Sequence, residues 1–119
     1  MPAPSVSEPL KTYKNHNRVL LVFATSPEDE KFMTQQRLLG DAEKGLQERG
    51  LVVLELLEGE RAGALRDNFK VASDIFTVIL VGKDGGEKKR FLEPVSLEEL
   101  FSVIDQMPMR RREMRKQKG

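Results

Sequence analysis

Three short runs of apolar side chains, and a fourth run of mixed charge, are separated by polar stretches that contain glycine or proline. Residues 19–24 form a continuous apolar run, and residues 51–57 form a second one that is interrupted only by Glu55. Such runs are typical of strands that are buried on both faces of a parallel or mixed sheet. Residues 75–81 and 87–92 are the third and fourth predicted strands, and the Asp84-Gly85 pair between them indicates a β-hairpin. The alternating charge of the fourth run favours an edge of the sheet.

The stretches between these runs carry apolar residues at helical spacing. A long helix is predicted to begin with Ser26 as its N-cap and Pro27 at its first position, and to end near Gly50 as its C′ residue. Gly40 weakens this helix, so we expect a kink or a break there. The stripe that faces the sheet is predicted to consist of Phe32, Gln36, Leu39, Ala42 and Leu46.

Two more helices complete the pattern. A short helix is predicted for residues 64–70 after a charged loop at 58–63, and the last helix follows a capping box of Ser96 and Glu99 and reaches Met107. Strands joined through a helix are expected to run parallel. The predicted order, βαβαββα, resembles the thioredoxin-like α/β fold, a four-stranded mixed sheet with helices on both faces.

The predicted elements fit one domain. We expect residues 18–108 to form the thioredoxin-like domain, residues 1–17 to be a flexible lead-in, and residues 109–119 to be a basic tail. Pro108 is expected to interrupt the last helix before that tail.

The chain of 119 residues contains no cysteine, which excludes a disulfide framework, a thiolate nucleophile and any cysteine-ligated metal. In the thioredoxin-like fold the redox dithiol follows the first strand, where this chain has Thr25 and Ser26. We therefore interpret these two residues as a vestigial active-site position. The cis-proline that thioredoxins carry before their third strand is replaced by Phe76.

Other candidates for catalysis or metal binding are weak. A Ser26 nucleophile would need a neighbouring base, and the single histidine, His16, precedes the first strand. The acidic residues 28–30 suit the first turn of a helix better than a metal site. Residues 82–86 lack the spacing of a phosphate-binding loop. We predict no catalytic residue, no metal site and no cofactor.

Charge is distributed unevenly along the chain. The 20 basic and 19 acidic residues give a net charge of +1, but residues 107–119 contain six basic residues and one acid. The end of the chain is therefore positive and the body is negative, so an acidic partner would be met by the tail. The candidate partner-binding residues are Arg110, Arg111, Arg112, Met114 and Arg115.

Two interpretations of this tail stay open: a solvated segment, or a contact with a protein or a polyanion. We expect no sequence-specific nucleic-acid binding, because the tail has no aromatic side chain for stacking on bases. No apolar run approaches the ~18 residues that a membrane span needs, so we expect a soluble chain.

The compartment and the oligomeric state also stay open. Residues 1–8 lack the apolar stretch of a signal peptide. The chain as written is expected to be cytoplasmic, and periplasmic or secreted if a signal peptide has been removed.

Several segments carry a closer resemblance: residues 18–24, 51–55 and 81–86, and above all the tail phrase at 105–114. Together they resemble the DUDES domain family. This family comprises small bacterial proteins of unknown function and modules of vertebrate extracellular proteins, the down-regulated-by-oncogenes, equarin and sushi-repeat group. The resemblance implies a thioredoxin-like fold without the dithiol and, for the animal modules, a matrix or adhesion role. It supplies no catalytic residues.

Two functional hypotheses follow. In the first, the chain is a non-catalytic binding module whose contact is the basic C-terminal segment, so deleting residues 110–119 should abolish partner capture and leave thermal stability nearly unchanged. In the second, it is a residual enzyme of the thioredoxin or peroxiredoxin class that uses a partner's thiol beside Thr25 and Ser26. We favour the first because the dithiol, the cis-proline and a suitable base are missing.

Overall fold

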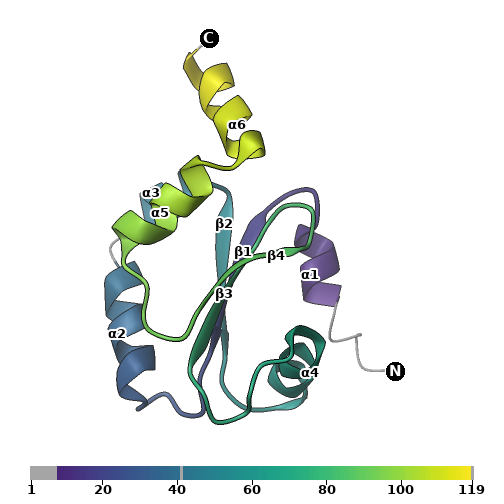
Figure 1. Ribbon diagram of the computed structural model, residues 1–119, viewed down its shortest axis with the longest axis vertical. Coiled ribbons are helices and arrows are strands. Elements are labelled where there is room, and N and C mark those ends of the chain that lie inside the picture. The colour runs from purple at the N-terminus through teal and green to yellow at the C-terminus, as the bar shows by residue number, and fades with distance from the viewer. Residues whose placement is uncertain (1–7, 41, 119) are drawn as a thin grey trace.

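A mixed sheet of four strands forms the centre of the computed structural model, which describes residues 8–40 and 42–118 (Figure 1). The strands are β1 (Arg18–Phe23), β2 (Leu51–Leu56), β3 (Thr77–Val81) and β4 (Glu87–Phe91). Their order is β2-β1-β3-β4, with β1 parallel to β2 and antiparallel to β3, and β3 antiparallel to β4. The predicted mixed sheet, its parallel pair and its hairpin are confirmed, and β4 lies at an edge.

Helices cover both faces of the sheet, as predicted. On one face lie α2 (Glu30–Leu39), α3 (Glu43–Glu48) and α5 (Leu97–Asp105), and on the other lie α1 (Glu8–Tyr13) and α4 (Glu60–Phe69) (Figure 1). The last helix, α6 (Pro108–Lys118), follows α5 and projects beyond the end of the sheet. Over the described ranges, no helix combines the length and the apolar character that crossing a membrane requires.

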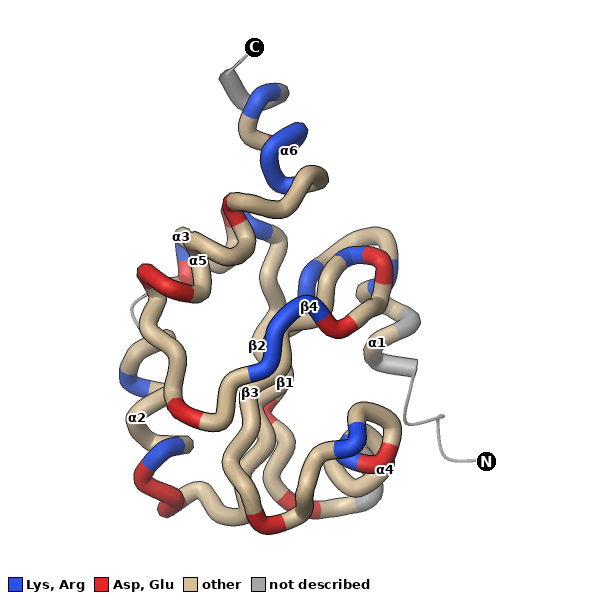
Figure 2. The backbone as a smooth tube through the Cα atoms, viewed as in Figure 1, with Lys and Arg blue, Asp and Glu red and all other residues tan. Residues whose placement is uncertain are grey.

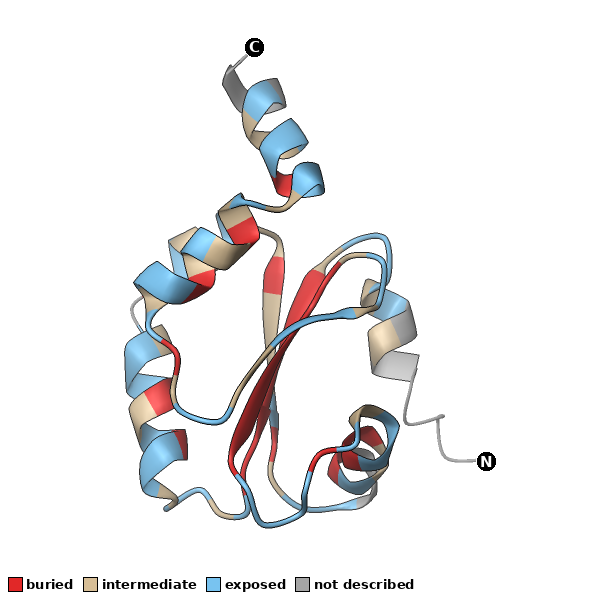
Figure 3. Cartoon of the chain, viewed as in Figure 1, coloured by how far each residue is buried: buried red, intermediate tan, exposed pale blue. Residues whose placement is uncertain are grey.

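Strand β1 is buried along its whole length and divides the core into two layers (Figure 3). Its residues 20 and 22, with Ala24 directly after the strand, pack in a cluster with side chains of α2 and α5, and residues 19, 21 and 23 pack in a second cluster with side chains of α4. This alternation follows from the two-residue period of a strand. A continuous apolar run was therefore the correct signal for the central strand.

The first long helix begins later than predicted. Asp29, not Ser26, is the N-cap of α2, because its side chain accepts a hydrogen bond from the amide of Phe32 at 3.0 Å. Ser26 instead closes the preceding turn: its hydroxyl accepts from the amide of Glu28 at 3.1 Å. The prediction of a Ser26 cap was wrong, because the serine satisfies a nearer amide and leaves the cap position to the aspartate.

The predicted interruption at Gly40 is confirmed as a break. Helix α2 ends at Leu39, and α3 begins at Glu43. Gly50 has a φ of 58°, the left-handed conformation expected of a C′ glycine.

The polar position in the stripe of α2 was assigned one residue too late. Gln35 is buried, and its amide forms two hydrogen bonds with the backbone of Val95, 3.1 Å to the carbonyl oxygen and 2.8 Å from the amide nitrogen. Gln36 is exposed and donates to Glu55 at 2.9 Å. The buried amide therefore ties α2 to the segment that leads into α5.

Two helical segments differ from the prediction. Helix α4 begins at Glu60, inside the predicted loop, and its N-cap is Gly59, which has no side chain to mark the start. Helix α1 lies within the predicted lead-in, and its Leu10 and Tyr13 pack against the α4 side of the core. The first seven residues of that lead-in lie outside the described residues.

A close approach of α3 and α5 generates a prediction about stability. A Cβ added at Gly45 would lie 2.8 Å from Cε2 of Phe101, and the guanidinium of Arg49 lies 3.9 Å from the centroid of that same ring. Gly45→Ala should therefore lower the free energy of unfolding, by roughly 1–3 kcal/mol for such overpacking.

The matched control is Gly63→Ala in α4, where a Cβ meets nothing within 4 Å. This change should raise the free energy of unfolding by about 0.5–1 kcal/mol, since alanine is the better helix former. Urea unfolding of the two variants measures the contrast, and equal stabilities would contradict the proposed packing.

Candidate functional site

The C-terminal basic segment is a helix with an inner and an outer side. Pro108 occupies the start of α6, where its missing amide costs nothing, after α5 has ended at Asp105. Much of the backbone of this helix is contributed by Lys and Arg residues, which are coloured blue in Figure 2. The predicted interruption near Pro108 is thus confirmed, and the predicted tail continues as a second helix.

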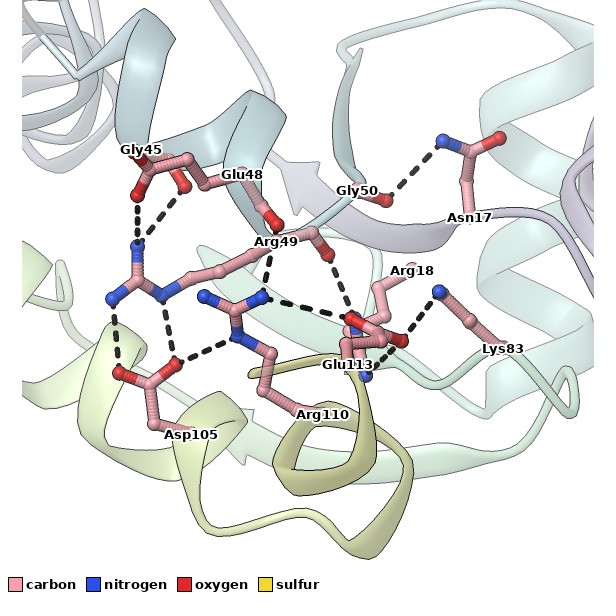
Figure 4. A network of polar contacts seen from close by, with 10 residues as sticks. All are labelled: Asn17, Arg18, Gly45, Glu48, Arg49, Gly50, Lys83, Asp105, Arg110 and Glu113. Atoms are coloured by element: carbon pink, nitrogen blue, oxygen red, sulfur yellow. Dashed lines mark hydrogen bonds and ion pairs between the residues drawn. The ribbon is translucent and has the colours of Figure 1, made fainter. Parts of the chain in front are cut away.

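The first anchor of α6 is an ion pair with the central strand (Figure 4). Nη1 and Nη2 of Arg18 lie 3.3 and 3.2 Å from Oε1 and Oε2 of Glu113, and the Arg18 side chain is 1% exposed. Nη1 also donates to the carbonyl of Arg49 at 2.7 Å. Nζ of Lys83 lies 2.6 Å from Oε2 of Glu113. One acid of α6 thus receives two cations from the sheet and the hairpin turn.

The second anchor is Arg110, which points into the body (Figure 4). Its Nε lies 3.2 Å from Oδ1 of Asp105, and its Nη1 donates to the carbonyl of Glu48 at 3.0 Å. Asp105 also accepts from Nε and Nη2 of Arg49, at 3.1 and 2.9 Å. Arg110 is buried, so it is an internal anchor and not an exposed partner-binding residue, which corrects its assignment from the sequence.

This anchoring network holds more positive than negative charge. The four cations Arg18, Arg49, Lys83 and Arg110 pair with the carboxylates of Asp105 and Glu113, and Arg49 also lies 4.0 Å from the more exposed carboxylate of Glu48. Burial raises the pKa of both carboxyl groups, but hydrogen bonds from the cations outweigh it, so the pKa of each lies below its ordinary value. Both acids are therefore held in their charged form.

The outer side of α6 carries the other predicted contact residues. Arg111, Arg112 and Arg115 are exposed, and no described residue forms an ion pair or a hydrogen bond with their guanidinium groups. Met114 is half-buried. The spacing of Arg110 and Glu113, three residues apart on one helical face, was the sequence signal that could have separated inner from outer residues.

A cavity of about 260 Å³ lies at the base of α6, between the helix and the turn that joins β3 to β4. Its lining includes Met107, Pro108 and Met109 from the helix side, and Lys83 and Lys88 from the hairpin. Apolar and basic groups therefore meet here. No local sequence pattern predicts this cavity, because its two sides are far apart in the chain.

The predicted vestigial position lies at the other end of β1. Thr25 and Ser26 fall between the end of β1 and the start of α2, and Thr25 is exposed. The hydroxyl of Ser26 donates to Oε2 of Glu28 at 2.5 Å, so its polar neighbour is a carboxylate and not a histidine. A solvent-exposed carboxylate is a weak base for a hydroxyl. The contact is therefore that of a turn.

A second cavity, of about 270 Å³, is lined by Thr25 together with Arg66 of α4 and Glu58. Arg66 is buried and donates to the carbonyls of Ala24 and Ala72 at 3.0 and 2.8 Å. Burial lowers the pKa of the Arg66 guanidinium below its ordinary value, with opposition from a nearby acid. The guanidinium serves to hold the end of β1 against α4.

The remaining candidates lie apart from one another. His16 is exposed in the turn before β1. Residues 82–86 form the predicted hairpin turn, with the Gly82 amide donating to the Gly86 carbonyl at 2.9 Å. In the part of the chain that the structure describes, no three acidic or histidine side chains gather as a metal-binding group.

Comparison with solved structures bears on the fold. The chain superimposes with a TM-score of 0.71 on a reduced 2-Cys peroxiredoxin of Plasmodium vivax, at 13% identity, covering 87% of this chain and 84% of that one. A thioredoxin peroxidase I of Plasmodium yoelii gives the same TM-score at 14% identity, covering 87% and 79%. These likenesses confirm the thioredoxin-like fold and extend no further than the fold.

Comparison with known sequences bears on the family. A family model described as a domain of unknown function, DUF4174, matches residues 9–113. The sushi repeat-containing protein SRPX2 of Bos taurus is 26% identical over 111 residues, which cover 81% of this chain and 24% of that protein. The chain thus spans about a quarter of this relative, and the resemblance to the sushi-repeat group is confirmed.

The anchoring network generates a prediction about pH. Glu113→Gln should lower the free energy of unfolding at pH 7 by roughly 1–3 kcal/mol, because the buried Arg18 loses its carboxylate. The folded pKa of Glu113 lies below its unfolded value, so its contribution is present above the unfolded pKa and is lost as the pH falls through the folded one. The difference between wild type and variant should therefore shrink in acid.

Urea unfolding of both proteins at several pH values between neutral and strongly acidic measures this difference. Glu58→Gln, which removes an exposed carboxylate that forms no ion pair with a described side chain, is the matched control and should change little. A difference that is independent of pH would show that Glu113 stabilises α6 by some means other than its charge.

Proposed function

This chain belongs to the DUF4174 family of domains of unknown function, and from that premise we propose that it is a non-catalytic binding module. It holds an acidic partner through the exposed face of α6. The thioredoxin-like body, which has no cysteine and hence no redox dithiol, serves as the rigid support.

The observation that carries this proposal is the division of α6 into two sides. Arg110 and Glu113 form ion pairs with residues of the body. The other three arginines are exposed and have no partner among the described residues: Arg111, Arg112 and Arg115. A helix that is fixed at its inner side loses little entropy when its outer side binds. Three unpartnered guanidinium groups on such a helix favour carboxylates or sulfates, to which arginine can donate two parallel hydrogen bonds.

The same division changes how the proposal must be tested. Deleting residues 110–119 would remove Glu113 and leave the buried Arg18 without a carboxylate. The expectation that this deletion leaves stability nearly unchanged does not fit the geometry. Substitution of outer residues alone separates binding from folding.

We expect the triple variant Arg111→Ala, Arg112→Ala, Arg115→Ala to bind immobilised polyglutamate about tenfold more weakly than wild type, since three exposed ion pairs of ~0.5 kcal/mol each are lost. The affinity of the triple variant should also depend less steeply on salt concentration than the affinity of wild type does. Biolayer interferometry at two salt concentrations measures both effects, with heparin as a second probe for anionic polysaccharide.

The matched control removes three exposed cations from the body: Arg37→Ala, Lys44→Ala, Lys89→Ala. It lowers the net charge by the same amount and should retain most of the affinity. If both triple variants lose affinity equally, attraction by net charge explains the binding and α6 has no special role.

The proposal also concerns catalysis, because the structural neighbours include peroxidases. We expect no insulin reduction in dithiothreitol and no peroxide consumption above buffer, since the position after β1 offers hydroxyls and no thiol. The double variant Thr25→Ala, Ser26→Ala should behave as wild type does. Ser102→Ala, which changes an exposed serine elsewhere, is the control. If wild type and this control show turnover and the double variant does not, the residual-enzyme hypothesis is favoured instead.

A further inference from the structure

The cavity at the base of α6 has a wall that suits an apolar side chain. Met107, Pro108 and Met109 line it, and Met109 is 44% exposed. Methionine is flexible and polarizable, so such walls adapt to differently shaped apolar groups. A volume of about 260 Å³ admits a single side chain of the size of leucine or phenylalanine.

Positive charge surrounds this apolar wall. The lining contains the cations Arg18, Lys83 and Lys88 and only one acid, Asp84. Lys88 pairs with Asp84 at 2.6 Å and Lys83 with Glu113 at 2.6 Å, and both lysine side chains remain partly exposed. An ammonium group has three donors, so each lysine can serve a further carboxylate.

The outer arginines of α6 continue this positive charge away from the cavity. Met109, Arg112 and Arg115 follow one another at i, i+3 spacing, which places them in successive turns along one flank of the helix. Arg112 and Arg115 are exposed and unpartnered among the described residues. A peptide that leaves the cavity along this flank would meet one apolar group and then two guanidinium groups.

We propose that the cavity receives one apolar side chain of an acidic peptide segment in a partner protein, whose carboxylates lie against Lys83, Lys88 and Arg112. This inference rests on the proposed function and specifies its partner. Charge complementarity favours a peptide, because an anionic polysaccharide would satisfy the cations and leave the methionine wall without a ligand. A second copy of this chain is the competing occupant.

The test compares two fluorescein-labelled peptides of equal charge, Glu-Glu-Leu-Glu-Glu and Glu-Glu-Ser-Glu-Glu, by fluorescence anisotropy. We expect wild type to bind the leucine peptide about tenfold more tightly, as burial of a leucine side chain implies. Met109→Gln should remove most of that preference and leave the affinity for the serine peptide unchanged. Met33→Gln, which alters an equally exposed methionine on α2, is the control and should change neither value.

The outcomes separate this inference from the proposed function. Arg112→Gln should lower the affinity for both peptides by the same factor of about two to three, because it removes a charge and leaves the cavity intact. Equal affinities of wild type for the two peptides would overturn the cavity proposal, whereas weakening by the outer arginine variants would still support the proposed function. Concentration-dependent sedimentation that Met109→Gln abolishes would identify a second copy as the occupant and also overturn it.

Discussion

One buried guanidinium determines where the C-terminal helix lies. Arg18, the first residue of the central strand, pairs with Glu113, which is 95 positions later in the chain. Removing a charge from water is costly unless it is paired. If α6 left the body, Arg18 would either become exposed or stay buried without its carboxylate. The ion pair therefore fixes the basic helix to the core strand, and the outer arginines are held on a helix that is attached to the sheet.

The strands and the hairpin could be predicted because their signals are local. Apolar runs, an Asp-Gly turn and a glycine within a helix act over a few residues. The predictions that were wrong concern residues whose burial depends on backbone far away in the sequence. Gln35 and Gln36 both fit a helical stripe that begins at Phe32, and only the backbone of Val95, sixty positions away, selects Gln35 for burial. Gly59 gives no side-chain signal that a helix begins.

The sequence analysis predicted which basic residues make up the candidate site, but it did not separate those that face the body from those that face outward. A count of charges treats the segment as one basic block, but a period of 3.6 residues turns Arg110 and Glu113 inward and leaves Arg111, Arg112 and Arg115 outside. The partners of the inner pair come from β1, the hairpin turn and the ends of α3 and α5. The spacing of Arg110 and Glu113 places them on one helical face, but it does not show which distant residues pair with them.

The position interpreted from the sequence as a vestigial active site and the proposed contact lie at opposite ends of the same strand. Thr25 and Ser26 follow the carboxyl end of β1, whereas Arg18 opens its amino end, a separation of about 20 Å for an extended strand of this length. None of the ion pairs that hold the cation network involves Thr25 or Ser26. A scaffold that lacks cysteine can still present a fixed basic helix, because the ion pairs that hold this helix lie at the amino end of β1 and not at the position of Thr25 and Ser26.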